Sequence, residues 1–122
     1  MSANTTISEI RIMLFPKDFA LTRAFYQGTV QWPISHEWDY DNSKGMMFDT
    51  GAGTIELLWP GENNGNYNLS FRVVDVWSLW KNLSERATVL FALRENPWGD
   101  DSFCILDPDG NKLTFFTDRP SI

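Results

Sequence analysis

Hydrophobic and polar residues follow the same order twice along the chain. Residues 10–15 and 67–73 each alternate between apolar and polar side chains, as strands with one buried face do. A helical pattern follows each of them, with small or apolar residues spaced on one face. Those residues are Leu21, Ala24, Phe25 and Gly28 in the first half, and Val76, Leu79, Trp80 and Leu83 in the second. We therefore predict a strand followed by a helix in each half.

An aspartate precedes each predicted helix. Asp18 and Asp75 stand where a helix N-cap belongs, and the carboxylate of an N-cap accepts hydrogen bonds from the first backbone N–H groups of the helix. A second pair recurs at nearly the same separation, because Glu56 and Thr114 take corresponding places in the last strand of each half. These matches indicate one small unit repeated twice.

Turn-forming residues divide the rest of each half into three further strands. We predict them at about 34–40, 45–49 and 54–59, and again at about 88–94, 102–106 and 112–116, with residues 60–66 as the linker. Each half thus reads β-α-β-β-β, as module 1 over about residues 8–60 and module 2 over about 66–118. One module alone would struggle to bury a core. We predict a single α+β domain, residues 1–122, whose two βαβββ modules share a curved mixed sheet with helices on its outer face.

Composition excludes several classes of protein. The net charge of -6 argues against binding nucleic-acid phosphates; it would suit a cationic ligand, and it would equally serve solubility alone. No apolar run is long enough to span a membrane, and residues 1–8 lack the basic and apolar stretches of a secretory signal. Cys104, the only cysteine, lies in an apolar strand and is expected to be a buried, inert thiol. The absence of any internal disulfide fits the cytoplasm.

Four segments, taken in order, resemble the glyoxalase/bleomycin-resistance/extradiol-dioxygenase family, also called the vicinal oxygen chelate superfamily. They are Asp18 followed by Phe25-Tyr26, Asp75 after Phe71-Arg72-Val73, Pro97-Trp98-Gly99, and Asp107-Pro108-Asp109-Gly110-Asn111. The resemblance covers nearly the whole chain and implies a fold in which the sheet curves around a cleft. It leaves the activity open, because the family contains isomerases, ring-cleaving dioxygenases, thiol transferases and proteins that only bind antibiotics.

The resemblance also implies where metal ligands would lie, on the first and last strands of each module. Those positions carry Arg11, Glu56, Asn68 and Thr114 here. Only Glu56 is a typical ligand, because arginine stays protonated and zinc or iron favours imidazole, thiolate and carboxylate over amide and hydroxyl. We therefore expect neither a metal nor another cofactor. Arg11 and Glu56 should share a face of the sheet, which favours an ion pair between them, or each points to solvent at the cleft mouth.

Aromatic residues supply the other candidate site. Trp98 lies in a Pro-Trp-Gly loop beside Asp100 and Asp101, where an indole next to carboxylates could receive a flat or cationic ligand; the alternative is a buried Trp that anchors the loop. His36 and Trp38 share one face of their strand, and Thr114 and Phe116 share one face of theirs. Both pairs are candidates to line the cleft, although a hydrogen-bonded or surface role for His36 is favoured over catalysis.

Two functions fit these observations. The first is a metal-free protein that binds a small organic molecule, such as an antibiotic, in an aromatic cleft through Arg11, Glu56, Asn68, Trp98, Thr114, Phe116, His36 and Trp38. The second is an enzyme of the same superfamily, a lyase, isomerase or dioxygenase, with Glu56 as its base or as a metal ligand. Relatives of this length pair two chains, so the resemblance implies a homodimer. Whether the cleft forms within one chain or between two is left open.

Overall fold

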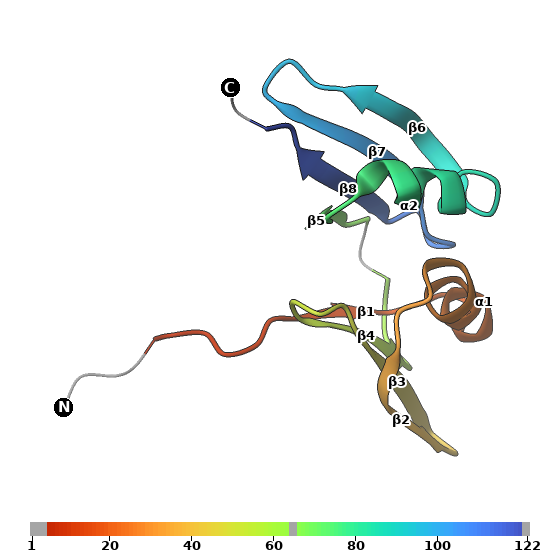
Figure 1. The fold of residues 1–122 in the computed structure, drawn as a ribbon. Helices are drawn as coiled ribbons and strands as arrows, with labels where there is room; N and C mark the ends of the chain where they lie inside the picture. Colours follow the sequence, from red (N-terminus) through yellow and green to blue (C-terminus); the bar gives the residue numbers. More distant parts are fainter. Residues whose placement is uncertain (1–4, 64–65, 121–122) are drawn as a thin grey trace. The chain divides into compact units, whose positions relative to one another are not determined.

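Residues 5–63 and 66–120 are described by a computed structural model of the chain, which divides into two compact units, Met1–Asn63 and Asn64–Ile122. Part of the predicted linker and half of residues 1–8 therefore lie outside the described residues. Each unit runs strand, helix and three strands in order, so the predicted βαβββ repeat and the α+β class are confirmed (Figure 1). None of the described helices has the length and apolar character needed to cross a bilayer.

The first unit is a four-stranded sheet with one helical segment. Its elements are β1 (Arg11–Leu14), α1 (Phe19–Ala24), the π-helix η1 (Phe25–Val30), β2 (Ile34–Tyr40), β3 (Ser43–Asp49) and β4 (Thr54–Trp59). The strand order is β1-β4-β3-β2. β1 is parallel to β4, whereas the other neighbours are antiparallel, so the sheet is mixed.

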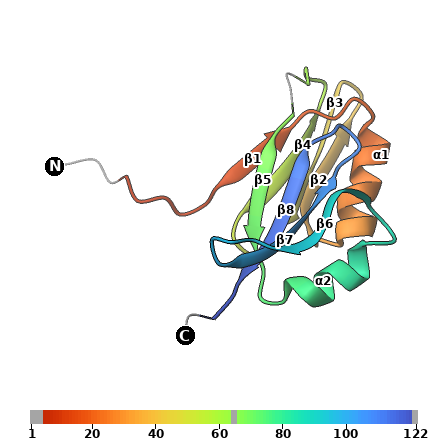
Figure 2. The ribbon, with the colours of Figure 1, turned by 90° about the horizontal axis from the view of Figure 1, so that it is seen from above.

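The second unit repeats this plan. Its elements are β5 (Asn68–Arg72), α2 (Val76–Leu83), β6 (Thr88–Glu95), β7 (Asp100–Leu106) and β8 (Lys112–Asp118), and the strand order is β5-β8-β7-β6 (Figure 2). Both predicted N-caps are confirmed. Asp18 accepts from the backbone N–H of Leu21 at 3.1 Å, and Asp75 accepts from that of Ser78 at 3.0 Å. Hydrogen bonds from the backbone N–H and the hydroxyl of Ser78 lower the pKa of Asp75 below its usual range.

The core of the first unit lies between its helical segment and one face of its sheet. Phe25 and Tyr26 are buried on this side, together with Leu14, Met46, Phe48, Ile55 and Leu57. The predicted helix face is wrong in part, because Leu21 is 56% exposed and Ala24 and Gly28 are exposed too, while Thr22 and Tyr26 are buried. The buried residues Thr22, Phe25 and Tyr26 keep the spacing of an α-helical face, shifted by one position from the predicted one. The Tyr26 ring packs with its centroid 5.9 Å from that of Phe48, and this orientation of the segment leaves Leu21 outside the core.

In the second unit α2 packs against β7 and β8 through the face that the sequence predicted. Val76 and Leu83 are buried, Leu79 and Trp80 are half-buried, and the rings of Trp80 and Phe103 lie 5.1 Å apart. Phe103 and Phe115, on neighbouring strands, continue this contact with ring centroids 5.5 Å apart. The register places these rings on the helix side of the sheet. Residues an odd number of positions away along the same strand therefore project from the opposite face of the sheet.

A turn whose end residues Asp107 and Asn111 are buried joins β7 to β8 in the second unit. One carboxylate oxygen of Asp107 accepts from the backbone N–H groups of Asp109 and Asn111, both at 2.9 Å, and the other accepts from Nδ2 of Asn111 at 2.8 Å. Asn111 in turn accepts from the backbone N–H of Tyr67 at 2.8 Å, just before β5. Gly110 has φ +87°, a value that favours glycine. The turn that carries part of the family resemblance thus fastens the two parallel strands of this unit.

Candidate functional site

In the first unit, the sheet face opposite the helix carries four of the predicted site residues. Strand pairing places Glu56 beside Met13 and Met47, and His36 beside Met47. Arg11 and Trp38 lie two positions away on their own strands and therefore share this face. Arg11, Glu56, His36 and Trp38 are thus brought to one face, as their spacing predicted.

The predicted ion pair between Arg11 and Glu56 is wrong for the described part of the chain. Arg11 instead contacts the carboxylate of Glu9 at 3.3 Å, and both side chains are about half exposed. Glu9 also accepts from the hydroxyl of Thr54 at 2.7 Å, and this hydrogen bond, more than Arg11, lowers the pKa of Glu9. The pattern of strand faces could not anticipate Glu9, because it precedes β1. Glu56 is only 8% exposed, and no described side chain donates a hydrogen bond to it.

Trp38 covers part of this face of the first unit. Its indole lies so close over Gly45, its strand partner, that any side chain at position 45 would collide with it. The indole nitrogen donates to the hydroxyl of Ser43 at 3.4 Å, and the His36 ring lies 5.7 Å from the Trp38 ring. The space over Gly45 is therefore filled by the protein itself. His36 and Trp38 lie side by side as predicted, with Trp38 half-buried in its own unit.

The second unit carries an open cavity on the corresponding face of its sheet. Its volume is about 260 Å³, and three aromatic residues and several polar ones line it. The lining residues are Ser70, Phe91, Arg94, Asn96, Trp98, Asp100, Ser102, Thr114 and Phe116. Aromatic walls with a few polar groups are typical of small-molecule sites. We call this cavity the Trp98 pocket.

Strand register explains why the pocket is open in one unit and filled in the other. Gly45 pairs with Trp38 and Leu58 in the first unit, whereas Ser102 pairs with Arg94 and Phe116 at the equivalent place in the second. Arg94 thus stands at the strand position equivalent to that of Trp38, and its guanidinium lies on the Phe91 ring. The two sheets share the same strand order, but the second has an arginine, Arg94, where the first has the tryptophan that covers Gly45.

An irregularity in β6 brings two of the lining residues together. Phe91 and Arg94 are three positions apart, so a regular strand would send them to opposite faces. The register of β6 against β7 shifts between them, and both therefore face the pocket. The guanidinium carbon of Arg94 lies 3.8 Å from the centre of the Phe91 ring, a close cation–π contact.

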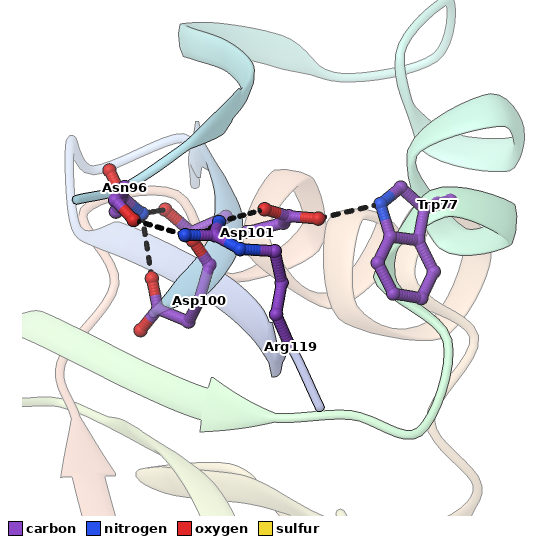
Figure 3. A network of polar contacts seen from close by, with 6 residues as sticks. Trp77, Asn96, Asp100, Asp101 and Arg119 are labelled. Carbon is purple, nitrogen blue, oxygen red and sulfur yellow. Dashed lines mark hydrogen bonds and ion pairs between the residues drawn. The ribbon is translucent and has the colours of Figure 1, made fainter. Parts of the chain in front are cut away.

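Trp98 is the most exposed lining aromatic, with 71% of its surface accessible. Its loop, between β6 and β7, is held by other residues (Figure 3). Nδ2 of Asn96 donates to Asp100 at 2.7 Å and to the hydroxyl of Ser102 at 2.8 Å, while Arg119 donates to the Asn96 carbonyl at 2.7 Å. The buried-anchor alternative therefore does not describe Trp98, because the loop is fastened without burying its indole.

The two carboxylates beside Trp98 have different environments. Asp101 is buried and lies between Arg119, which donates to it at 2.6 Å, and the Trp77 indole, which donates at 2.9 Å (Figure 3). Asp101 projects toward α2, so it is not available beside Trp98 as the sequence suggested. Adjacent residues of a strand point to opposite faces, and Asp100 alone lines the pocket.

The pocket brings together three of the predicted site residues, Trp98, Thr114 and Phe116. Asn68 lies on the same sheet face, two positions along β5 from Ser70, the partner of Thr114, but it does not line the cavity. The lining residues that the sequence did not indicate are Ser70, Phe91, Arg94, Asn96 and Ser102. Ser70 and Ser102 lie opposite Thr114 and Phe116 on neighbouring strands, so they share a sheet face with them. This pairing is the only signal that could have indicated some of these residues from the sequence.

The implied metal site has an unsuitable donor set. Within residues 5–63 and 66–120, no three His, Cys, Asp or Glu side chains gather as metal ligands. Arg11 brings a positive charge to its strand, and Asn68 and Thr114 offer only weak neutral donors. The residues present do not fit a zinc or iron centre at the implied positions.

The duplicated βαβββ plan places the chain among small α+β proteins built from paired modules. The model of the Glyoxalase/Bleomycin resistance protein/Dioxygenase superfamily matches residues 10–115, and the chain belongs to that superfamily. None of the curated proteins compared with the chain matches it.

Solved structures share the fold at low sequence identity. TioX from Micromonospora sp. ML1 is 15% identical, with a TM-score of 0.78 over 91% of this chain and 98% of its own. TnmS3, described as an antibiotic binding protein from Streptomyces sp. CB03234, is 20% identical, with a TM-score of 0.78 over 95% and 99%. A superfamily member from Sphaerobacter thermophilus DSM 20745 is 18% identical, with a TM-score of 0.75 over 94% and 100%. At these identities the likeness shows the fold alone.

Proposed function

We propose that this protein binds a small organic molecule in the Trp98 pocket without the help of a metal. The exposure of the Trp98 indole carries the proposal. An aromatic side chain of this size on a loop fastened by other residues leaves its face available to a flat ligand. Phe91 and Phe116 supply further apolar surface, and Ser70, Asn96 and Thr114 supply polar groups that fix orientation. The description of TnmS3 as an antibiotic binding protein makes an antibiotic one reasonable ligand.

Replacement of Trp98 tests the proposal. We expect Trp98→Ala to weaken binding of a planar probe, 2-naphthalenemethanol, by roughly 1–3 kcal/mol, because the variant loses a stacking surface. The melting temperature should hardly change, since Asn96 and Arg119 hold the loop. Calorimetric titration and thermal unfolding measure the two quantities. Trp59→Ala, in the first unit, is the matched control and should bind normally. A lower melting temperature with unaltered affinity would remove Trp98 from the site.

The alternative function is enzymatic, with Glu56 as its base or metal ligand. Glu56 favours it, because the residue is only 8% exposed and no described donor occupies its carboxylate oxygens, which leaves them available to act on a substrate. The reaction class would be that of a lyase, isomerase or dioxygenase. In this alternative Glu56→Gln would abolish turnover of a substrate found by activity screening, whereas binding at the Trp98 pocket would persist.

Metal content separates the two functions. We expect purified protein to carry no stoichiometric zinc, iron, nickel or manganese, because Arg11, Asn68 and Thr114 stand at three of the four implied ligand positions. Elemental analysis of protein prepared without chelators makes this measurement. About one tightly bound ion per chain, lost in Glu56→Gln, would instead support a metalloenzyme.

We further propose a homodimer in the cytoplasm. Val74 and Leu90 of the second unit are exposed apolar residues, and an obligate interface that covered such surface would typically bury more than about 2,000 Å². Sedimentation should give twice the chain mass at micromolar concentration, and a monomer would contradict the proposal. The single buried Cys104 suits a reducing compartment, which cell fractionation would test.

A further inference from the structure

The Trp98 pocket contains one cation whose hydrogen-bonding groups are not used by the protein. In the described part of the chain, the ion pairs of arginines join Arg11 to Glu9, Arg23 to Glu37, Arg72 to Asp118 and Arg119 to Asp101. Arg94 takes part in none of them and donates to no described residue. Its guanidinium therefore retains a full set of N–H donors at the edge of the cavity.

The Phe91 ring holds this guanidinium in a fixed place. With the guanidinium carbon 3.8 Å from the ring centre, the planar group is supported on one side by an aromatic face. A guanidinium that is already oriented loses less freedom when it binds a carboxylate through two parallel hydrogen bonds. The irregularity in β6 that turns both residues to the pocket is a feature often found beside binding sites.

Two other charged side chains near the pocket already have hydrogen-bond partners. Asp100 accepts from Nδ2 of Asn96 at 2.7 Å. Arg72, which lies 5.1 Å from the centre of the Phe116 ring, is paired with Asp118 at 3.1 Å. The pocket lining thus holds one carboxylate, bound by Asn96, and one guanidinium whose donors are unused, in a chain whose net charge is -6.

We propose that the Trp98 pocket selects planar aromatic molecules that bear an acidic substituent, with the aromatic body against Trp98 and Phe116 and the carboxylate on Arg94. This inference rests on the proposed function and gives its ligand a chemical class. It differs from the cationic ligand that the overall acidity suggested, because the unused N–H donors of Arg94 can hold a carboxylate, whereas the lining carboxylate of Asp100 already accepts from Asn96.

Three probes with one ring system test the charge preference. 2-Naphthoate, 2-naphthalenemethanol and 2-naphthylmethylamine are an anion, a neutral molecule and a cation at pH 7, and calorimetric titration gives the affinity of each. We expect the anion to bind at least about tenfold more tightly than the alcohol, as one charge-assisted hydrogen bond would provide. Added salt should reduce that advantage.

Arg94→Met, which keeps much of the side-chain length and removes the charge, assigns the preference to one residue. The variant should bind the anion about as weakly as the alcohol and should keep its affinity for the alcohol. Arg72→Met is the matched control and should retain the anion preference. Retention of that preference in Arg94→Met, or tightest binding of the cation by the native chain, would overturn the inference and leave the aromatic pocket standing. Failure of the alcohol to bind, or its indifference to Trp98→Ala, would overturn the pocket and the inference together.

Discussion

Asp107→Ala is expected to lower the free energy of unfolding by about 3 kcal/mol. The carboxylate of Asp107 is buried and accepts three hydrogen bonds within its turn, two of them from backbone N–H groups. Removal of the carboxylate leaves those donors without a partner, and buried unsatisfied donors cost about 1–3 kcal/mol each when they cannot reach water. Urea denaturation followed by circular dichroism measures the loss.

Two variants make this result interpretable. Asp41→Ala removes the same charge from the exposed turn between β2 and β3, and it should leave the stability unchanged. Asp107→Asn keeps one acceptor oxygen and should fall between the native chain and the alanine variant. Equal stability of Asp107→Ala and Asp41→Ala would show that the turn does not depend on its carboxylate.

Arg119→Ala is expected to destabilise the chain by about 2 kcal/mol and to weaken binding of a planar probe as well. Its side chain, 34% exposed, donates to Asp101, whose side chain is only 7% exposed, and to the backbone carbonyls of Asn96 and Asp100. Loss of the guanidinium leaves a buried carboxylate with only the Trp77 indole as a donor, and a broken buried pair typically costs 3–5 kcal/mol. Partial access of water reduces that cost here.

Arg72→Ala is the control for Arg119→Ala. Arg72 also pairs with a carboxylate of the same unit, but the side chains of Arg72 and Asp118 are 69% and 58% exposed. Exposed pairs add little to stability, so this variant should unfold almost as the native chain does. A similar loss in both variants would mean that the contacts of Arg119 in Figure 3 have no special weight.

Local signals in the sequence account for most of the fold. Asp18 and Asp75 identify two helix starts because an N-cap acts on neighbouring backbone groups, and its chemistry does not depend on distant contacts. The alternation of each strand likewise gives the buried face without knowledge of its neighbours. Leu21 shows the limit of such reasoning. Its exposure accompanies the burial of Thr22 and Tyr26, one position along from the predicted face, which the spacing of apolar residues does not reveal.

The candidate site was harder to predict for two physical reasons. Trp98, Thr114 and Phe116 could be found because one is in a recognisable loop and the others keep strict strand parity. Arg94 breaks that parity, since the shift in β6 depends on pairing with β7 and has no local signature. The partner of Arg11 was missed because competition between Glu9 and Glu56 is decided by the path of the chain before β1.

Gly45 and Ser102 take equivalent places in the two units but have different surroundings, and this difference affects how the chain can evolve. A duplicated unit allows one copy to conserve packing while the other accumulates changes in chemistry. Nearly any substitution at Gly45 would displace the Trp38 indole, so the first copy is constrained. Phe91 and Arg94 face an open cavity, and their replacement would alter what is bound with little harm to the core. New ligand preferences should therefore arise in the second copy, which makes residues 66–120 the natural target for directed diversification.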